Sequence, residues 1–187
     1  NIKLEFMNLN LNELVQQVNG EFAERFEGRN LDLICILQPE PLLIRADSRR
    51  IWRVLENLYV NVCKYAMPGT RVYVDAIKKD GKIQLSIKNI SENPLNFQAD
   101  ELTERFIRGD VSRSTEGSGL GLAIAKSFAE LQGGTFSITV DGDLFKATVT
   151  LPDTNQPEQP ETLPLPAAPD ADAQSAPQTG GALPAGI

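Results

Sequence analysis

The stretch TEGSGLGLAIAKSF, Thr115–Phe128, places glycines at alternate positions directly before an apolar run. The apolar residues recur at helical spacing, so we expect a helix that starts near Gly119 or Leu120 and ends at Gly133 and Gly134. Bare backbone amides at a helix N-terminus bind phosphate groups readily. The glycine spacing matches neither a Walker loop nor a dinucleotide fingerprint. The same glycines would also allow a tight entry of the chain against a sheet, and this alternative stays open.

A second informative segment is the long helix predicted from Asp47 or Ser48 to about Ala66, which Pro68 and Gly69 end. At about 100° per residue, one stripe of this helix faces the core and consists of Ile51, Leu55, Leu58 and Val62. A second stripe lies about 100° away and consists of Asn57, Asn61 and Lys64.

Asparagine is a poor helix former, so two of them at positions i and i+4 suggest a ligand for this second stripe. An amide oxygen suits Mg²⁺, which prefers oxygen ligands and keeps several waters, and Lys64 would then face phosphates. An ordinary polar helix face remains the alternative.

The remaining elements alternate between helices and hairpins. We expect a first helix that Asn12 caps and Gly28 ends, and a polar loop or lid over residues 90–116 with a weak helical patch at 100–107. Strands are expected at residues 31–37, 41–46, 71–78, 82–89, 135–140 and 144–151. Adjacent hairpins without repeated crossovers favour an α+β fold, a two-layer α/β sandwich in which about three helices cover one face of a mixed sheet.

Composition separates one domain, residues 1–152, from a Pro/Ala-rich tail at 153–187 that carries acids and no base. We expect this tail to be disordered. Without its five acids the body holds 18 basic and 20 acidic residues, which argues against nucleic-acid binding through a basic face.

The cysteine and histidine content limits the chemistry further. Cys35 and Cys63 sit in apolar stretches without metal-ligand spacing, and we expect reduced core thiols in a cytoplasmic setting. The absence of histidine excludes histidine-based catalysis by this chain. No apolar run approaches the roughly 20 residues that a membrane span needs, so we do not expect membrane insertion of this piece. The first residue is not methionine, which is consistent with a fragment of a longer protein.

The order of these motifs, an Asn-containing helix, a hairpin, ERFIRGD at 104–110 and then GSGLGL, resembles the catalytic ATP-binding domain of sensor histidine kinases. That domain has the Bergerat fold, an α/β sandwich shared with gyrase and the mismatch-repair ATPases. The resemblance covers about residues 9–152. It implies ATP and Mg²⁺ as cofactors.

The resemblance also implies roles for single residues. In ENLYVNVCKY, Asn61 would bind Mg²⁺, Asn57 would support the same face, Lys64 would contact phosphate, and Tyr65 would pack beside adenine, while Glu56 is a weaker candidate for orienting groups or accepting a proton. Phe106 and Arg108 correspond to the family's F box, with Arg108 a phosphate contact. The second glycine box consists of Gly117, Gly119, Leu120 and Gly121.

One segment departs from the family pattern. Where the family places Asp-x-Gly-x-Gly after the second hairpin strand, this chain has KNISENPLNF, with Asn89 in the place of the aspartate and Ser91 in that of the first glycine. An uncharged amide oxygen can still accept a hydrogen bond from the adenine amino group, but a weaker one than a carboxylate accepts.

The resemblance implies transfer of the γ-phosphoryl group of ATP to a histidine on a separate helical dimerisation and phosphoacceptor segment. The full protein would then be a membrane-anchored sensor kinase that passes phosphate to a response regulator. The altered adenine segment leaves a second hypothesis, a non-catalytic nucleotide-binding or interaction module. A gyrase-type ATPase is a third, and it is disfavoured because those enzymes have an acid where this chain has Asn57.

Overall fold

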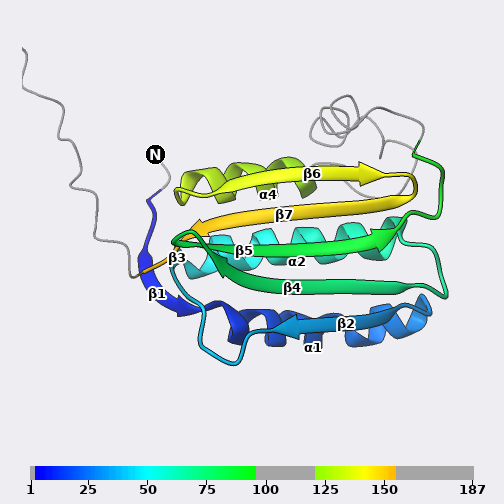
Figure 1. The fold of residues 1–187 in the computed structure, drawn as a ribbon, viewed down its shortest axis with the longest axis horizontal. Helices are drawn as coiled ribbons and strands as arrows, with labels where there is room; N and C mark the ends of the chain where they lie inside the picture. The colour runs from blue at the N-terminus through cyan, green and yellow to red at the C-terminus, as the bar shows by residue number, and fades with distance from the viewer. Residues whose placement is uncertain (1–2, 96–120, 155–187) are drawn as a thin grey trace, which may run out of the picture. The chain divides into compact units, whose positions relative to one another are not determined.

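The computed structural model describes residues 3–95 and 121–154, all within the compact unit formed by residues 1–157 (Figure 1). A second unit comprises residues 158–187. The elements of the first unit follow one another in the order β1 (Phe6–Asn10), α1 (Leu11–Gly28), β2 (Asp32–Leu37), β3 (Leu43–Asp47), α2 (Ser48–Tyr65), β4 (Arg71–Lys79), β5 (Lys82–Ile90), α4 (Gly121–Leu131), β6 (Thr135–Asp141) and β7 (Leu144–Pro152).

The main sheet is mixed and has five strands in the order β2-β4-β5-β7-β6. The β2-β4 pair is parallel, whereas β4-β5, β5-β7 and β6-β7 are antiparallel. Figure 1 shows α1, α2 and α4 on the same side of this sheet. The predicted α+β sandwich, with helices on one face of a mixed sheet, is therefore confirmed.

The alternation of buried apolar side chains along β5 explains why the helices pack on one face of the sheet. Ile83, Leu85 and Ile87 are buried and belong to the core, while Gln84 and Ser86 between them point to the opposite face of the sheet. At the edge of the sheet, β2 pairs only with β4, and its Ile36 is 61% exposed. Among the described residues, the helices thus pack on one face of the sheet.

Three details differ from the sequence prediction. The cap of α1 is Asn10 and not Asn12: the Asn10 side chain accepts from the Asn12 N–H, while the Asn12 amide donates to the carbonyls of Gln38 and Glu40. The strand predicted at 41–46 is β3, which pairs with the unpredicted strand β1 in a separate two-stranded sheet. The tail was predicted to start at Asp153, but this residue still contacts the domain, because its Oδ2 lies 2.5 Å from Lys78 Nζ.

Asp47 caps the N-terminus of α2 and connects this helix to the two-stranded sheet of β1 and β3. Its carboxylate accepts from the backbone N–H groups of Arg49 and Arg50, as a helix cap does, and from the N–H of Glu5 at 2.9 Å. The Arg50 guanidinium lies 3.0 Å from Oδ2. The hydrogen bond from Glu5 is the largest of the effects that lower the pKa of Asp47, and together with Arg50 it outweighs the opposing effect of burial.

Among the described residues, no helix is long and apolar enough to cross a lipid bilayer.

Gly134 allows α4 to pack closely on β7, and its replacement tests this contact. A Cβ at position 134 would lie 2.3 Å from the Thr150 carbonyl oxygen and 3.1 Å from that of Ala129. We expect Gly134→Ala to lower the free energy of unfolding by about 1–3 kcal/mol in urea titrations. Gly20→Ala is the matched control, because a Cβ there meets nothing within 4 Å. It should raise stability by about 0.5–1 kcal/mol, and equal effects of the two variants would contradict the packing argument.

The lowered pKa of Asp47 predicts a pH-dependent stability. A carboxylate with a lowered folded pKa stabilises the fold fully above its unfolded pKa of about 3.9, and this contribution is lost as the pH falls through the folded value. Asp47→Asn keeps the cap but removes the charge. We expect it to be less stable than the wild type near neutral pH, with the difference shrinking below about pH 4. A difference that stays constant from pH 6 to pH 3 would show that the charge contributes nothing.

Candidate functional site

Helix α2 presents the two stripes that the sequence predicts. Its buried side consists of Ile51, Val54, Leu55, Leu58, Tyr59 and Val62. The polar residues of the second stripe, Asn57, Asn61 and Lys64, are all partly buried. Tyr59 anchors the helix to α1, because its ring stacks on Phe26 and its hydroxyl donates to Asn19 Oδ1. The orientation of α2 therefore leaves the Asn57 side partly open.

The structure brings Asn57 next to the first residue of α4. A Cβ on Gly121 would lie 3.5 Å from Asn57 Oδ1, an ordinary van der Waals distance. Asn57 Nδ2 is buried and has no hydrogen-bond partner among the described residues. An unsatisfied buried donor costs about 1–3 kcal/mol, so this amide is a group that a ligand could satisfy.

Asn89 lies on β5, on the same side of the strand as the core residues Leu85 and Ile87. It is 3% exposed, and it pairs in register with the buried Phe145 of β7. Its Oδ1 is buried, and within residues 3–95 and 121–154 it has no hydrogen-bond partner. This buried amide oxygen without a protein partner in this part of the fold is the second group that a ligand could satisfy.

Backbone hydrogen bonds hold the end of β5 against the end of α2. Met67 N donates to the Ile90 carbonyl at 2.8 Å, and Glu92 N donates to the Tyr65 carbonyl at 2.8 Å. Tyr65 is partly buried and packs against the core. This junction fixes the segment after Asn89 beside the C-terminal end of α2.

Arg29, which sequence reasoning missed, strengthens the same junction. Its Nη2 donates to the Ala66 carbonyl at 2.7 Å and lies 3.5 Å from Glu92 Oε2. Arg29 follows α1 directly, and its partners lie 37 and 63 positions away, so no local pattern could have identified them.

The charged candidates on α2 differ in their surroundings. Glu56 forms an ion pair with Arg53 at 2.9 Å, one turn earlier on the helix. Lys64 has no acidic partner among the residues that the structure describes. Between Asn61 and Lys64, burial raises the pKa of the Cys63 thiol despite the nearby Arg25 and Arg29. A protonated, half-buried thiol agrees with the structural role expected for this cysteine.

Several predicted site residues lie outside the described ranges: Phe106, Arg108, Gly117, Gly119 and Leu120. The same holds for residues 96–116 of the lid predicted at 90–116 and for the predicted start of the last helix, whereas Ile90 belongs to β5. Of the second glycine box, the structure describes Gly121 alone, at the beginning of α4.

The available donors fit a hard cation that is bound through few protein groups. No cluster of three or more His, Cys, Asp or Glu side chains that could hold a metal occurs in the described part of the chain. Mg²⁺ keeps most of its waters and needs one or two protein oxygens besides substrate phosphates. The side-chain oxygen of Asn61, beside the unsatisfied Asn57 amide, suits that requirement.

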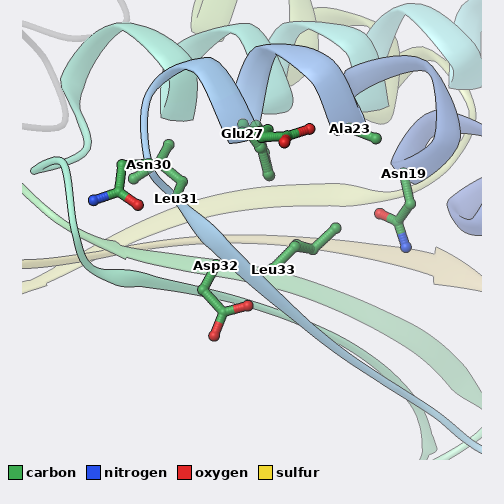
Figure 2. A pocket seen from close by; sticks show the side chains of 8 residues that line it. Asn19, Ala23, Glu27, Asn30, Leu31, Asp32 and Leu33 are labelled. Atoms are coloured by element: carbon green, nitrogen blue, oxygen red, sulfur yellow. The ribbon is translucent and has the colours of Figure 1, made fainter.

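A separate pocket, with a volume of about 410 Å³, lies between α1 and the start of β2. Figure 2 shows the side chains that line it. Asn19, Ala23 and Glu27 line it from the helix, and Asp32 and Leu33 line it from the strand. None of the predicted site residues lines this pocket.

Residues 46–155 match a protein family described as "Histidine kinase-, DNA gyrase B-, and HSP90-like ATPase". The matched region begins before α2 and extends past β7, so it includes Asn57, Asn61, Asn89 and Gly121.

Individual relatives are sensor kinases. The chain is 32% identical over 165 residues to the sensor protein KdpD of Escherichia coli K12, covering 86% of this chain and 18% of KdpD. It is 32% identical over 123 residues to the histidine-protein kinase BaeS of the same organism, covering 65% of this chain and 26% of BaeS. The chain thus spans about a fifth to a quarter of the length of these relatives.

Solved structures agree with these matches. The catalytic domain of the histidine kinase ThkA superposes with a TM-score of 0.71 at 27% identity, covering 80% of this chain and 97% of that domain. ThkA in complex with the response regulator TrrA gives a TM-score of 0.66 at 26% identity, covering 81% of this chain and 42% of ThkA.

Proposed function

Because the chain belongs to the histidine kinase-, DNA gyrase B- and HSP90-like ATPase family, we propose that it binds Mg²⁺-ATP and transfers the γ-phosphoryl group to a histidine. The observation that carries this proposal is the pair of buried, unsatisfied amides at Asn57 and Asn89. One lies on the polar stripe of α2, and the other lies on the strand whose end is bonded to the end of that helix. Together they suit a ligand with a phosphate end and a base end.

The proposed roles follow from position and chemistry. Asn61 would supply an oxygen to Mg²⁺, Asn57 would support the same polar face, and Lys64 would contact phosphate. Asn89 would read the base, and Tyr65 would pack beside it. When bound, Mg²⁺ neutralises charge on the phosphates, and the residues of the chain position the nucleotide.

Six further assignments rest on the family resemblance: the nucleotide site would be completed by Phe106, Arg108, Gly117, Gly119, Leu120 and the described Gly121. Glu56 is a weak candidate for proton transfer, because it is paired with Arg53 on the exposed side of α2.

The acceptor has to come from outside this chain, which contains no histidine. We propose a helical dimerisation and phosphoacceptor segment of the same full-length protein. An imidazole nitrogen of that segment would form a bond to the γ-phosphorus while the bond to the bridging oxygen breaks and ADP leaves. The phosphoryl group would then pass to a response regulator, for which the complex of ThkA with TrrA is a precedent. We also propose that the chain is a cytoplasmic domain of a membrane-anchored sensor kinase, because its relatives KdpD and BaeS are a sensor protein and a signal transduction histidine-protein kinase.

A non-catalytic nucleotide-binding module of the same fold is the second candidate. The observation that favours it is the replacement of the usual aspartate and glycine by Asn89 and Ser91. Ser91 is fully engaged, since its N–H donates to the Asp143 carbonyl and its hydroxyl donates to the Asn93 carbonyl. Phosphotransfer to the acceptor segment separates the two candidates, because the module would bind ATP without transferring phosphate.

Asn61→Ala tests the proposed metal contact. We expect a tenfold to hundredfold loss of Mg²⁺-dependent ATP affinity by calorimetry, because a contact worth about 1.5–3 kcal/mol is removed. The free energy of unfolding should change by less than about 0.5 kcal/mol, because this side chain faces away from the core. In the presence of the phosphoacceptor segment, labelled phosphate should no longer reach histidine.

Gln17→Ala is the matched control, since it removes an exposed amide from α1. It should change neither ATP affinity nor stability. If Asn61→Ala unfolds the protein but leaves the ATP affinity of the folded fraction intact, Asn61 is a structural residue and the proposed site is wrong.

A further inference from the structure

The amide oxygen of Asn89 has no protein partner in the described part of the fold that would fix its orientation. This Oδ1 is buried without a hydrogen bond within residues 3–95 and 121–154, and the residue is 3% exposed. Its neighbours on the same strand face and in the paired strand are apolar. Ile87 precedes it on the same face of β5, and Phe145 lies opposite it on β7. Turning the amide by half a turn about its last side-chain bond would break no hydrogen bond to these residues.

This freedom matters because an amide carries both a donor and an acceptor, whereas a carboxylate carries acceptors only. Adenine presents an amino group at position 6, which needs an acceptor. Guanine presents a carbonyl oxygen there, which needs a donor. A buried carboxylate would repel the guanine oxygen, and such repulsion is one way in which a site rejects a wrong ligand.

The two polar residues that follow Asn89 most closely, Ser91 and Glu92, are engaged within the protein. The Ser91 side chain and N–H are both used within the protein. The Glu92 side chain lies beside Arg29, and its N–H is bonded to the Tyr65 carbonyl. Asn89 is thus the polar side chain that β5 presents on the side of the helices, and within the described residues its oxygen remains available to a base.

We propose that Asn89 lets the nucleotide site accept guanine as well as adenine nucleotides, by turning its amide to match the base. This inference rests on the proposed function, because it assigns the base specificity of the same site. With adenine the Asn89 oxygen accepts from the 6-amino group, and with guanine the Asn89 nitrogen donates to the 6-oxygen. The Mg²⁺ and phosphate contacts on α2 are the same for both nucleotides.

The test is calorimetric titration of the chain with ATP, GTP and inosine triphosphate in the presence of Mg²⁺. Inosine triphosphate has the 6-oxygen of guanine without its 2-amino group, so it isolates the proposed contact. We expect the three affinities of the wild type to lie within about tenfold of one another. Asn89→Asp should bind ATP at least as tightly as the wild type and GTP and inosine triphosphate about tenfold to hundredfold more weakly.

Two variants serve as controls. Asn61→Ala should weaken all three nucleotides by the same factor and leave their ratios unchanged, because it acts on the phosphate end. Asn89→Ala removes donor and acceptor together, so it should weaken all three similarly, and it keeps the test valid if Asn89→Asp fails to fold. Thermal melting establishes that each variant is folded.

The outcomes separate this inference from the proposed function. If the wild type binds ATP but binds GTP and inosine triphosphate over a hundredfold more weakly, the inference is wrong and the proposed function stands. If Asn89→Asp or Asn89→Ala leaves affinities and ratios unchanged, Asn89 does not read the base. If no nucleotide binds the wild type, both proposals fail.

Discussion

The burial of one stripe of α2 against the five-stranded sheet is the constraint on which the candidate site depends. Once Ile51, Leu55 and Val62 are buried, the helical period fixes where every other side chain of α2 points. The packing that stabilises the domain therefore also holds Asn57 beside Gly121 of α4, with Asn61 four residues further along the same stripe. The core residues and the site residues of this helix therefore depend on one another for their positions.

The candidate site also depends on the junction between the end of α2 and the end of β5. Strand alternation alone places Asn89 on the helix side, but the hydrogen bonds from Met67 and Glu92 bring the strand end to the helix end. The Arg29 guanidinium adds a bond to the Ala66 carbonyl, so three segments distant in sequence meet there. Each unsatisfied buried amide costs the free protein about 1–3 kcal/mol, a cost that fits a pre-formed binding site better than a stability role.

Sequence patterns predicted the parts of the molecule that depend on local periodicity. The two stripes of α2, the hairpins β4-β5 and β6-β7, and the family resemblance are confirmed by the structure and the family match. The patterns failed where residues far away in the sequence determine a strand or a helix cap. β1 exists because β3 pairs with it, and Asn12 is not the cap because its amide reaches Gln38 and Glu40. The contact of Arg29 with Ala66 has no local signal, while the roles of Asn61, Lys64 and Asn89 remain predictions.

The buried amide of Asn89 also has a consequence for proton linkage. A carboxylic acid at such a position would be desolvated, which raises its pKa above the usual value of about 4 and ties its charge to the pH of the solution. Asparagine does not titrate, so the end of the site that meets the base keeps the same protonation state from acidic to alkaline conditions. Asn89 therefore adds no pH dependence of its own to nucleotide binding, whereas a carboxylate in its place would add one.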